Sequence, residues 1–158
     1  MAFPRPRAAS DSWPEFTEFL GSDIRVVGVS LLGVVEAVGT PCVRTAAAVV
    51  PGTGGLISSR RFASVVVVRA SGDETGTLEA WIDADLRACS PALHECRLLG
   101  RRSTAADLPV VVQSVAAPGD ADGQLVALPA DLRAGDILAI PCATPVALFD
   151  IRGRARAL

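Results

Sequence analysis

The chain has 158 residues, half of them hydrophobic and a fifth charged, and its formal net charge is −2. This length allows one domain with a hydrophobic core, and the near-neutral charge provides no broad cationic surface for nucleic acid. All fifteen residues counted as lysine or arginine are arginine, so the chain has no lysine on which an aldehyde cofactor could form a Schiff base.

The four cysteines, Cys42, Cys89, Cys96 and Cys142, form no C-x-x-C pair, and with a single histidine they do not predict a zinc site. The first ten residues, MAFPRPRAAS, lack the apolar segment of a signal peptide. The most hydrophobic segment, residues 26–35, is too short to cross a bilayer. These features predict a cytoplasmic protein with reduced thiols and without a membrane or nucleic-acid partner.

The N-terminal segment, residues 1–11, is rich in proline and arginine and is predicted to be disordered. A short helix is predicted over residues 12–21. Ser12 and Glu15 have the spacing of a capping box, and Gly21 can end the helix. The sequence therefore predicts one short helix before the first β-strand.

Valine-rich segments separated by turn residues then recur at intervals of roughly ten residues, which is typical of a barrel or a sandwich. A second short helix is possible over residues 91–99. The chain is thus predicted to be a mostly β, single-domain barrel or sandwich over residues 12–150, with a solvated tail at 151–158. The predicted strands cover residues 24–39 (one long strand or two short ones), 41–50, 62–69, 77–83, 108–116, 125–129 and 136–141.

Three segments occur in an order that matches a known family. The first contains Ile82-Asp83-Ala84 and Pro91-Ala92-Leu93, at places where that family has V-D-x-G and R-P-A-L-Y patterns. The second, PVVVQSVAAPGDADG, stands where the family has a strand followed by C-E-S-x-D. The third, LPADLRAGDILAIP, is similar to L-P-x-L-x-x-G-D-x-L-x-x-P. On these residues, the segment 62–150 resembles the C-terminal β-domain of the ornithine/diaminopimelate/arginine decarboxylases, which are fold-type III pyridoxal-phosphate enzymes.

The positions that matter for catalysis in that family are changed here. The family's C-E-S-x-D cysteine, which reaches into the partner subunit's active site, falls at Ala116, and Asp120 lies further along the same motif. The tyrosine that helps to hold the cofactor phosphate falls near Val146, and the chain contains no tyrosine. The family's cofactor-holding barrel has no counterpart in these 158 residues. The resemblance therefore implies a degenerate domain with no catalytic residues and no cofactor of its own.

The resemblance also implies a protein partner, because the family's active site forms where the β-domain of one chain meets the barrel of another. The partner would be a chain with a cofactor barrel, or a second copy in a homodimer. The predicted function is a non-catalytic accessory subunit. One alternative is a split C-terminal subunit that completes a pyridoxal-phosphate-dependent lyase or racemase with a separate barrel chain. A second alternative is a small-molecule-binding β-barrel unrelated to this family.

Three residues are candidates for the interface or a pocket: Trp81, Asp83 and Cys142. Trp81 is predicted to anchor a core or an interface. Asp83 alternates with Asp85 along an extended segment, so the two could act as paired carboxylates or cation ligands, although turn capping is favoured. Cys142 follows a strand near the family's active-site face, and a buried thiol is favoured over a nucleophile.

Other patterns also have a functional and a structural interpretation, and the structural one is favoured each time. PGTGGLISS, residues 51–59, could cradle a phosphate but lacks the lysine of a P-loop. The run from His94 to Cys96 could combine a base with a nucleophile, but adjacent side chains point in different directions. Asp120 and Asp122 could bind calcium but lack EF-hand spacing.

Overall fold

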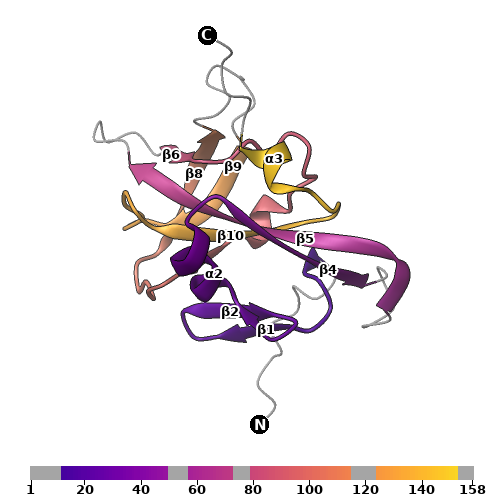
Figure 1. Cartoon of the computed structure of the whole chain (residues 1–158). Coiled ribbons are helices and arrows are strands. Elements are labelled where there is room, and N and C mark those ends of the chain that lie inside the picture. Colours follow the sequence, from indigo (N-terminus) through magenta and orange to yellow (C-terminus); the bar gives the residue numbers. More distant parts are fainter. Residues whose placement is uncertain (1–11, 50–56, 73–78, 115–123, 153–158) are drawn as a thin grey trace.

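The computed structural model describes residues 12–49, 57–72, 79–114 and 124–152. A three-stranded sheet and a helix pack against a larger, curled seven-stranded sheet that forms a half-barrel (Figure 1). The elements are β1 Thr17–Leu20, β2 Asp23–Val26, β3 Val29–Ser30, α2 Leu31–Val38, β4 Cys42–Val49, β5 Ile57–Gly72, β6 Glu79–Ile82, the 3-10 turn η1 Leu93–Glu95, β7 Arg97–Leu99, β8 Asp107–Ser114, β9 Gln124–Pro129, β10 Ile137–Cys142 and α3 Leu148–Ile151.

The helix predicted over residues 12–21 is wrong in its position. Residues 17–20 form β1, which pairs antiparallel with β2. Phe16 has a left-handed φ of 56°, which ends any helix begun at Ser12, and the Glu15 N–H donates to the Ala47 carbonyl of β4 at 2.8 Å. The capping-box spacing was therefore outweighed by tertiary pairing of the following residues.

The helix near the N-terminus is α2 instead, in a segment predicted as strand. Its N-cap is Ser30, whose Oγ accepts a hydrogen bond from the Gly33 N–H at 3.0 Å. The Asp23 carboxylate adds a second cap, because it accepts from the Leu32 N–H at 3.2 Å. The buried side chains of α2, Leu31 and Val35, are four residues apart. Valine content favours a strand, but capping and packing decide the conformation here.

The half-barrel has the strand order β7-β10-β5-β6-β8-β9, and β4 pairs with the first part of β5. Pairing is antiparallel throughout except between β6 and β8, which are parallel. It follows that β6, β8 and β10 run in one direction, whereas β5, β7 and β9 run in the other. The mostly β, barrel-like fold predicted from the sequence is thus confirmed.

The long strand β5 separates two hydrophobic cores. Val66 and Val68 face the inside of the half-barrel, together with Leu138 and Ile140 of β10. The alternating residues of β5, such as Val67, face the layer formed by β1, β2 and α2. Both faces of the strand are buried, and for this reason the segment reads as a continuous apolar run rather than an alternating one.

Most of the other predicted strands are confirmed with small shifts at their ends. The hairpin of residues 62–69 and 77–83 corresponds to β5 and β6, although β5 begins earlier, at Ile57, inside the segment predicted as a loop. The helix predicted over 91–99 is wrong, because only η1 is helical and residues 97–99 form β7. Among the described residues, no helix is long and apolar enough to cross a membrane.

Candidate functional site

The segment after β6, the last residue of β8 and the segment after β10 meet at one end of the half-barrel. After β6, the Ala84 carbonyl accepts a hydrogen bond from Ser114 Oγ, at the end of β8, at 2.5 Å. The next residue, Asp85, donates its N–H to the Ile151 carbonyl of α3 at 2.7 Å. Ala84 and Ile151 are fully buried. We call this region, formed by residues 81–85, Ser114 and residues 146–151, the tied end.

The tied end brings together residues from the segments on which the expectation of a decarboxylase-like β-domain is based. Asp83 directly follows β6, and Val146 lies between β10 and α3. The second segment begins within β8, which ends at Ser114. Ala116 and Asp120, with Asp122, lie outside the described residues, as do residues 1–11 and 51–56.

Asp83 ties the hairpin to the N-terminal half of the chain. Its carboxylate accepts from the Arg69 N–H at 2.8 Å and from Thr40 Oγ1 at 2.6 Å. Asp85, two residues on, accepts instead from the Arg87 side chain, with the shortest bond at 2.6 Å. The Arg87 hydrogen bond holds the pKa of Asp85 below its ordinary value, in spite of burial. The two carboxylates therefore have separate partners, as expected for structural roles.

Cys142 is a buried thiol at the end of β10. Its hydrogen bond with the Cys89 thiol and its burial both raise its pKa. Cys96 is half-buried, and desolvation of its thiol raises the pKa to about 12, whereas the neighbouring His94 side chain is 80% exposed. A thiol that stays protonated at neutral pH is a weak nucleophile, so neither cysteine has the environment of a catalytic one.

Val146 fills space where the resemblance implies a phosphate-binding tyrosine. Its side chain is buried in the barrel core, and its N–H donates to Ser64 Oγ, also buried, at 3.0 Å. An aliphatic side chain held in this way offers no donor to a phosphate. At this position the tied end can contribute shape, but no acid, base or phosphate contact.

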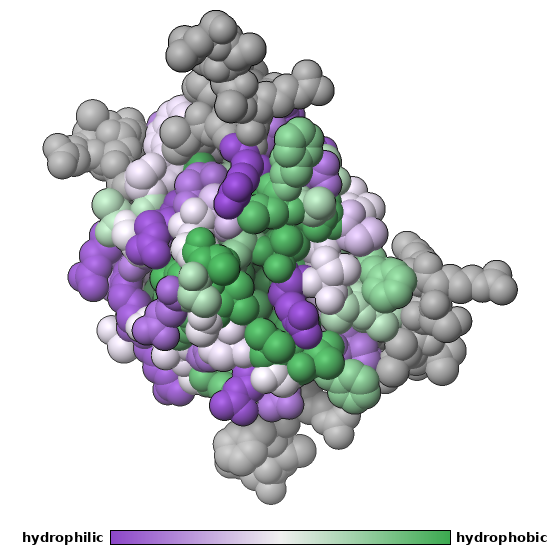
Figure 2. Space-filling view, in the orientation of Figure 1, coloured by the Kyte–Doolittle hydropathy of each residue, from purple (hydrophilic) through white to green (hydrophobic). Residues whose placement is uncertain are grey.

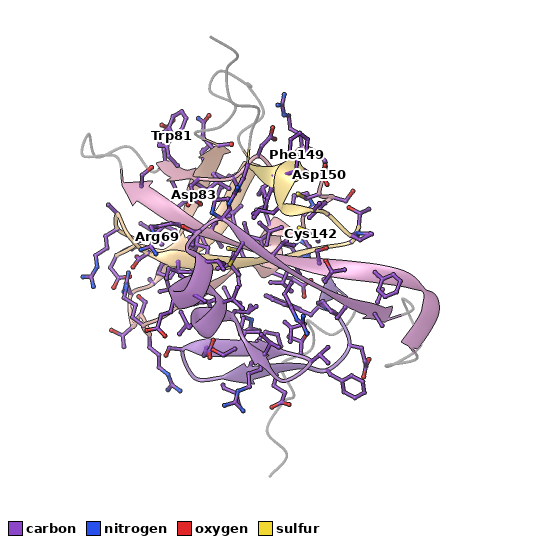
Figure 3. The ribbon with its side chains drawn as sticks, in the orientation of Figure 1. Arg69, Trp81, Asp83, Cys142, Phe149 and Asp150 are labelled. Atoms are coloured by element: carbon purple, nitrogen blue, oxygen red, sulfur yellow. The ribbon has the colours of Figure 1, made fainter. Side chains whose placement is uncertain are left out.

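The exposed feature of the tied end is aromatic. Phe149, at the second position of α3, is 83% exposed, whereas its neighbour Ile151 is buried. Trp81 of β6 is half-buried. Figure 3 shows Trp81 and Phe149 at the same end of the molecule, and Figure 2 shows apolar surface over α3 on the same view. An aromatic ring on a short, anchored helix resembles the anchor residues of protein interfaces.

Sequence reasoning named Trp81 but missed Phe149. The run Leu148-Phe149-Asp150-Ile151 could have indicated a short helix with an aromatic residue. The chain has few aromatic residues, and Asp150 can cap the N-terminus of a helix by accepting a backbone hydrogen bond. The Asp150 carboxylate does accept from the Ala147 N–H at 2.9 Å. The pattern alone did not say which of the apolar side chains would face solvent.

No protein-family model, curated protein or solved structure matches this chain.

Proposed function

We propose that this chain is a non-catalytic, decarboxylase-like β-domain that acts as an accessory subunit by binding a partner chain through the tied end. The observation that supports this most is that the segment after β6, the end of β8 and the segment after β10 converge there and expose Phe149 rather than a reactive group. By resemblance, this is the part of the domain that would face the barrel of a partner. A rigid support and one exposed aromatic ring favour docking over chemistry.

The chemical argument rests on the side chains available. A pyridoxal-phosphate decarboxylase needs an imine, a phosphate cradle and a proton donor. The chain has no lysine and no tyrosine, and Val146 occupies the position near which the resemblance places the tyrosine. Cys142 is buried, and its pKa is raised. The partner would therefore supply the cofactor if the complex has any activity.

The proposal is tested by capture of a partner with tagged chain in extracts of its host, followed by reconstitution from purified components. We expect a stable complex with a chain that contains a pyridoxal-phosphate barrel, and no decarboxylation by this chain alone with added cofactor. Activity that arises only on mixing would replace the accessory role by that of a split enzyme subunit. A monomer that forms no complex with any barrel-containing chain would contradict the proposal.

A further inference from the structure

The half-barrel is open on the side between β7 and β9, the two end strands of its sheet. A groove of about 220 Å³ runs along this opening. Phe19 and Ile24 of the N-terminal sheet form one wall, Leu98 of β7 lies along it, and Ala127 and Pro129 of β9 form the other wall. We call this groove the open side. It is separate from the tied end, since none of its lining residues belongs to that end.

The β7 edge of the open side has backbone groups that bond to none of the residues the structure describes. The Gly100 N–H points away from β10, because it donates to the Ser22 carbonyl at 2.8 Å. The preceding Leu99 carbonyl must then point toward β10, with which Leu99 pairs through Ile137. Backbone groups alternate in direction along a strand, so the N–H and the carbonyl of Leu98 point away from β10. Leu98 lines the groove, and its backbone therefore faces the opening.

The β9 edge shows the same pattern. The Ala130 N–H donates to the Ala106 carbonyl on the β8 side at 2.9 Å. The alternation then directs the backbone groups of Leu128 toward its partner on β8, and it directs the N–H and carbonyl of Ala127 outward. The Pro129 carbonyl also points outward. Within the described part of the chain these outward donors and acceptors have no partner, so two unpaired sheet edges line one groove.

Two charged side chains lie along the open side without an ion-pair partner in the part of the chain that the structure describes. Arg97, at the start of β7, stacks its guanidinium 4.3 Å from the centre of the Phe19 ring. Asp107 is the first residue of β8, and it pairs with Pro129, the last residue of β9. Because β7 and β9 run in the same direction, Arg97 and Asp107 stand near opposite ends of the groove.

We propose that the open side binds an extended peptide segment of a partner protein by strand addition, antiparallel to both β7 and β9. An extended chain has alternating donors and acceptors, so it can pair with both edges at once, and antiparallel pairing is the stronger kind. In this orientation the peptide's C-terminal part lies near Arg97 and its N-terminal part near Asp107. The two charges therefore select a segment with a basic N-terminal end and an acidic C-terminal end.

The test uses a fluorescein-labelled peptide, RTVTVTE, titrated into the full chain and followed by fluorescence anisotropy. Ala127→Pro removes one outward N–H without removing a bond within the sheet, and proline is tolerated on an edge strand. Ala127→Val is the matched control, because it keeps the N–H. We expect saturable binding to wild type and to Ala127→Val, and about 10-fold weaker binding to Ala127→Pro. The charge-swapped peptide ETVTVTR is expected to bind about 5-fold more weakly.

A second peptide, N-methylated at alternate backbone nitrogens, keeps the test valid if Ala127→Pro does not fold. It is expected to lose binding to wild-type protein, since it cannot donate to the exposed edges. The proposal is overturned if RTVTVTE shows no saturable binding, if the N-methylated peptide binds as well as the unmodified one, or if folded Ala127→Pro binds like wild type. Phe149→Ser is expected to leave RTVTVTE binding unchanged, which separates this inference from the proposed accessory role at the tied end.

Discussion

The tied end and the open side are built in opposite ways from the same sheet. At the tied end, backbone groups are bonded across three segments, and Ala84 and Ile151 are fully buried. At the open side, the backbone groups of Leu98 and Ala127 face a groove and have no hydrogen-bond partner within residues 12–49, 57–72, 79–114 and 124–152. The tied end can therefore offer a partner a fixed side chain such as Phe149, whereas the open side can offer it backbone donors and acceptors. We propose that the two regions recognise partner proteins in two distinct ways.

The largest expected effect is a difference in amide hydrogen exchange between outward-facing and inward-facing N–H groups at the open side. Its absence would contradict the comparison directly. The N–H groups of Leu98 and Ala127 should exchange at least about 100-fold faster than those of Leu99 and Leu128, which point into the sheet. Two-dimensional NMR after transfer into heavy water measures these rates residue by residue. Equal protection within the two pairs would mean that the edges are not free.

A substitution at the tied end should have the largest effect on stability. Ile151→Ala removes a fully buried side chain from the barrel core and should lower the free energy of unfolding by about 2–5 kcal/mol. Phe149→Ala, two residues away and 83% exposed, should change it by less than about 0.5 kcal/mol. Urea unfolding measures both. Similar losses for the two variants would show that α3 is not anchored as described.

The loss of stability at low pH tests the ion pair that holds the end of β7 beside the open side. Arg101, which follows β7, bonds to the buried Asp136 carboxylate at 2.6 and 2.8 Å. Burial alone would raise the pKa of Asp136, but hydrogen bonds from Arg101 and from the Arg133 N–H outweigh it and lower the pKa.

A lowered pKa in the folded state means that the ionised Asp136 stabilises the fold above the pKa of an unfolded aspartate, about 3.9. This contribution is lost as the pH falls through the folded pKa. Asp136→Asn should therefore have a lower Tm than wild type at pH 7, and a smaller drop in Tm between about pH 5 and pH 2. Thermal melts across this range measure it, and parallel curves would show that the ion pair does not contribute.

The smallest effect is expected on the open side. Ala127→Val places a larger side chain on the exposed face of an edge strand, and it should change the free energy of unfolding by less than about 0.5 kcal/mol. Urea unfolding at equal protein concentrations measures this. A loss above about 1.5 kcal/mol would show that Ala127 is packed, and that the open side is closed in solution.

The central strands could be predicted from sequence because their signal is local and strong. The run Ser64-Val65-Val66-Val67-Val68 has the β-branched residues and the flanking turn that mark a buried strand. The same logic failed for α2, where Val34 and Val35 favour a strand. The helix depends on caps from Ser30 and Asp23 and on a core built from other elements, which residue preference does not reveal.

The candidate site was harder to predict, because it depends on which strands end at the same place. Trp81 and Asp83 were recognised as candidates, but the bonds from Thr40 and Arg69 to Asp83 join residues far apart in the chain. The open side was missed altogether, since closure of a barrel is a property of the whole sheet. Pro129 was the available signal, because a proline at a strand end is typical of an edge.

The most direct test of the proposed accessory role is the affinity of the purified partner chain for three versions of this protein, measured by biolayer interferometry. Leu125→Ser is the matched control for Phe149→Ser, because Leu125 is also an exposed apolar residue, at 68%, but lies on β9. The account predicts that Leu125→Ser binds like wild type and that Phe149→Ser binds at least about 10-fold more weakly. Equal affinities for Phe149→Ser and wild type would contradict it.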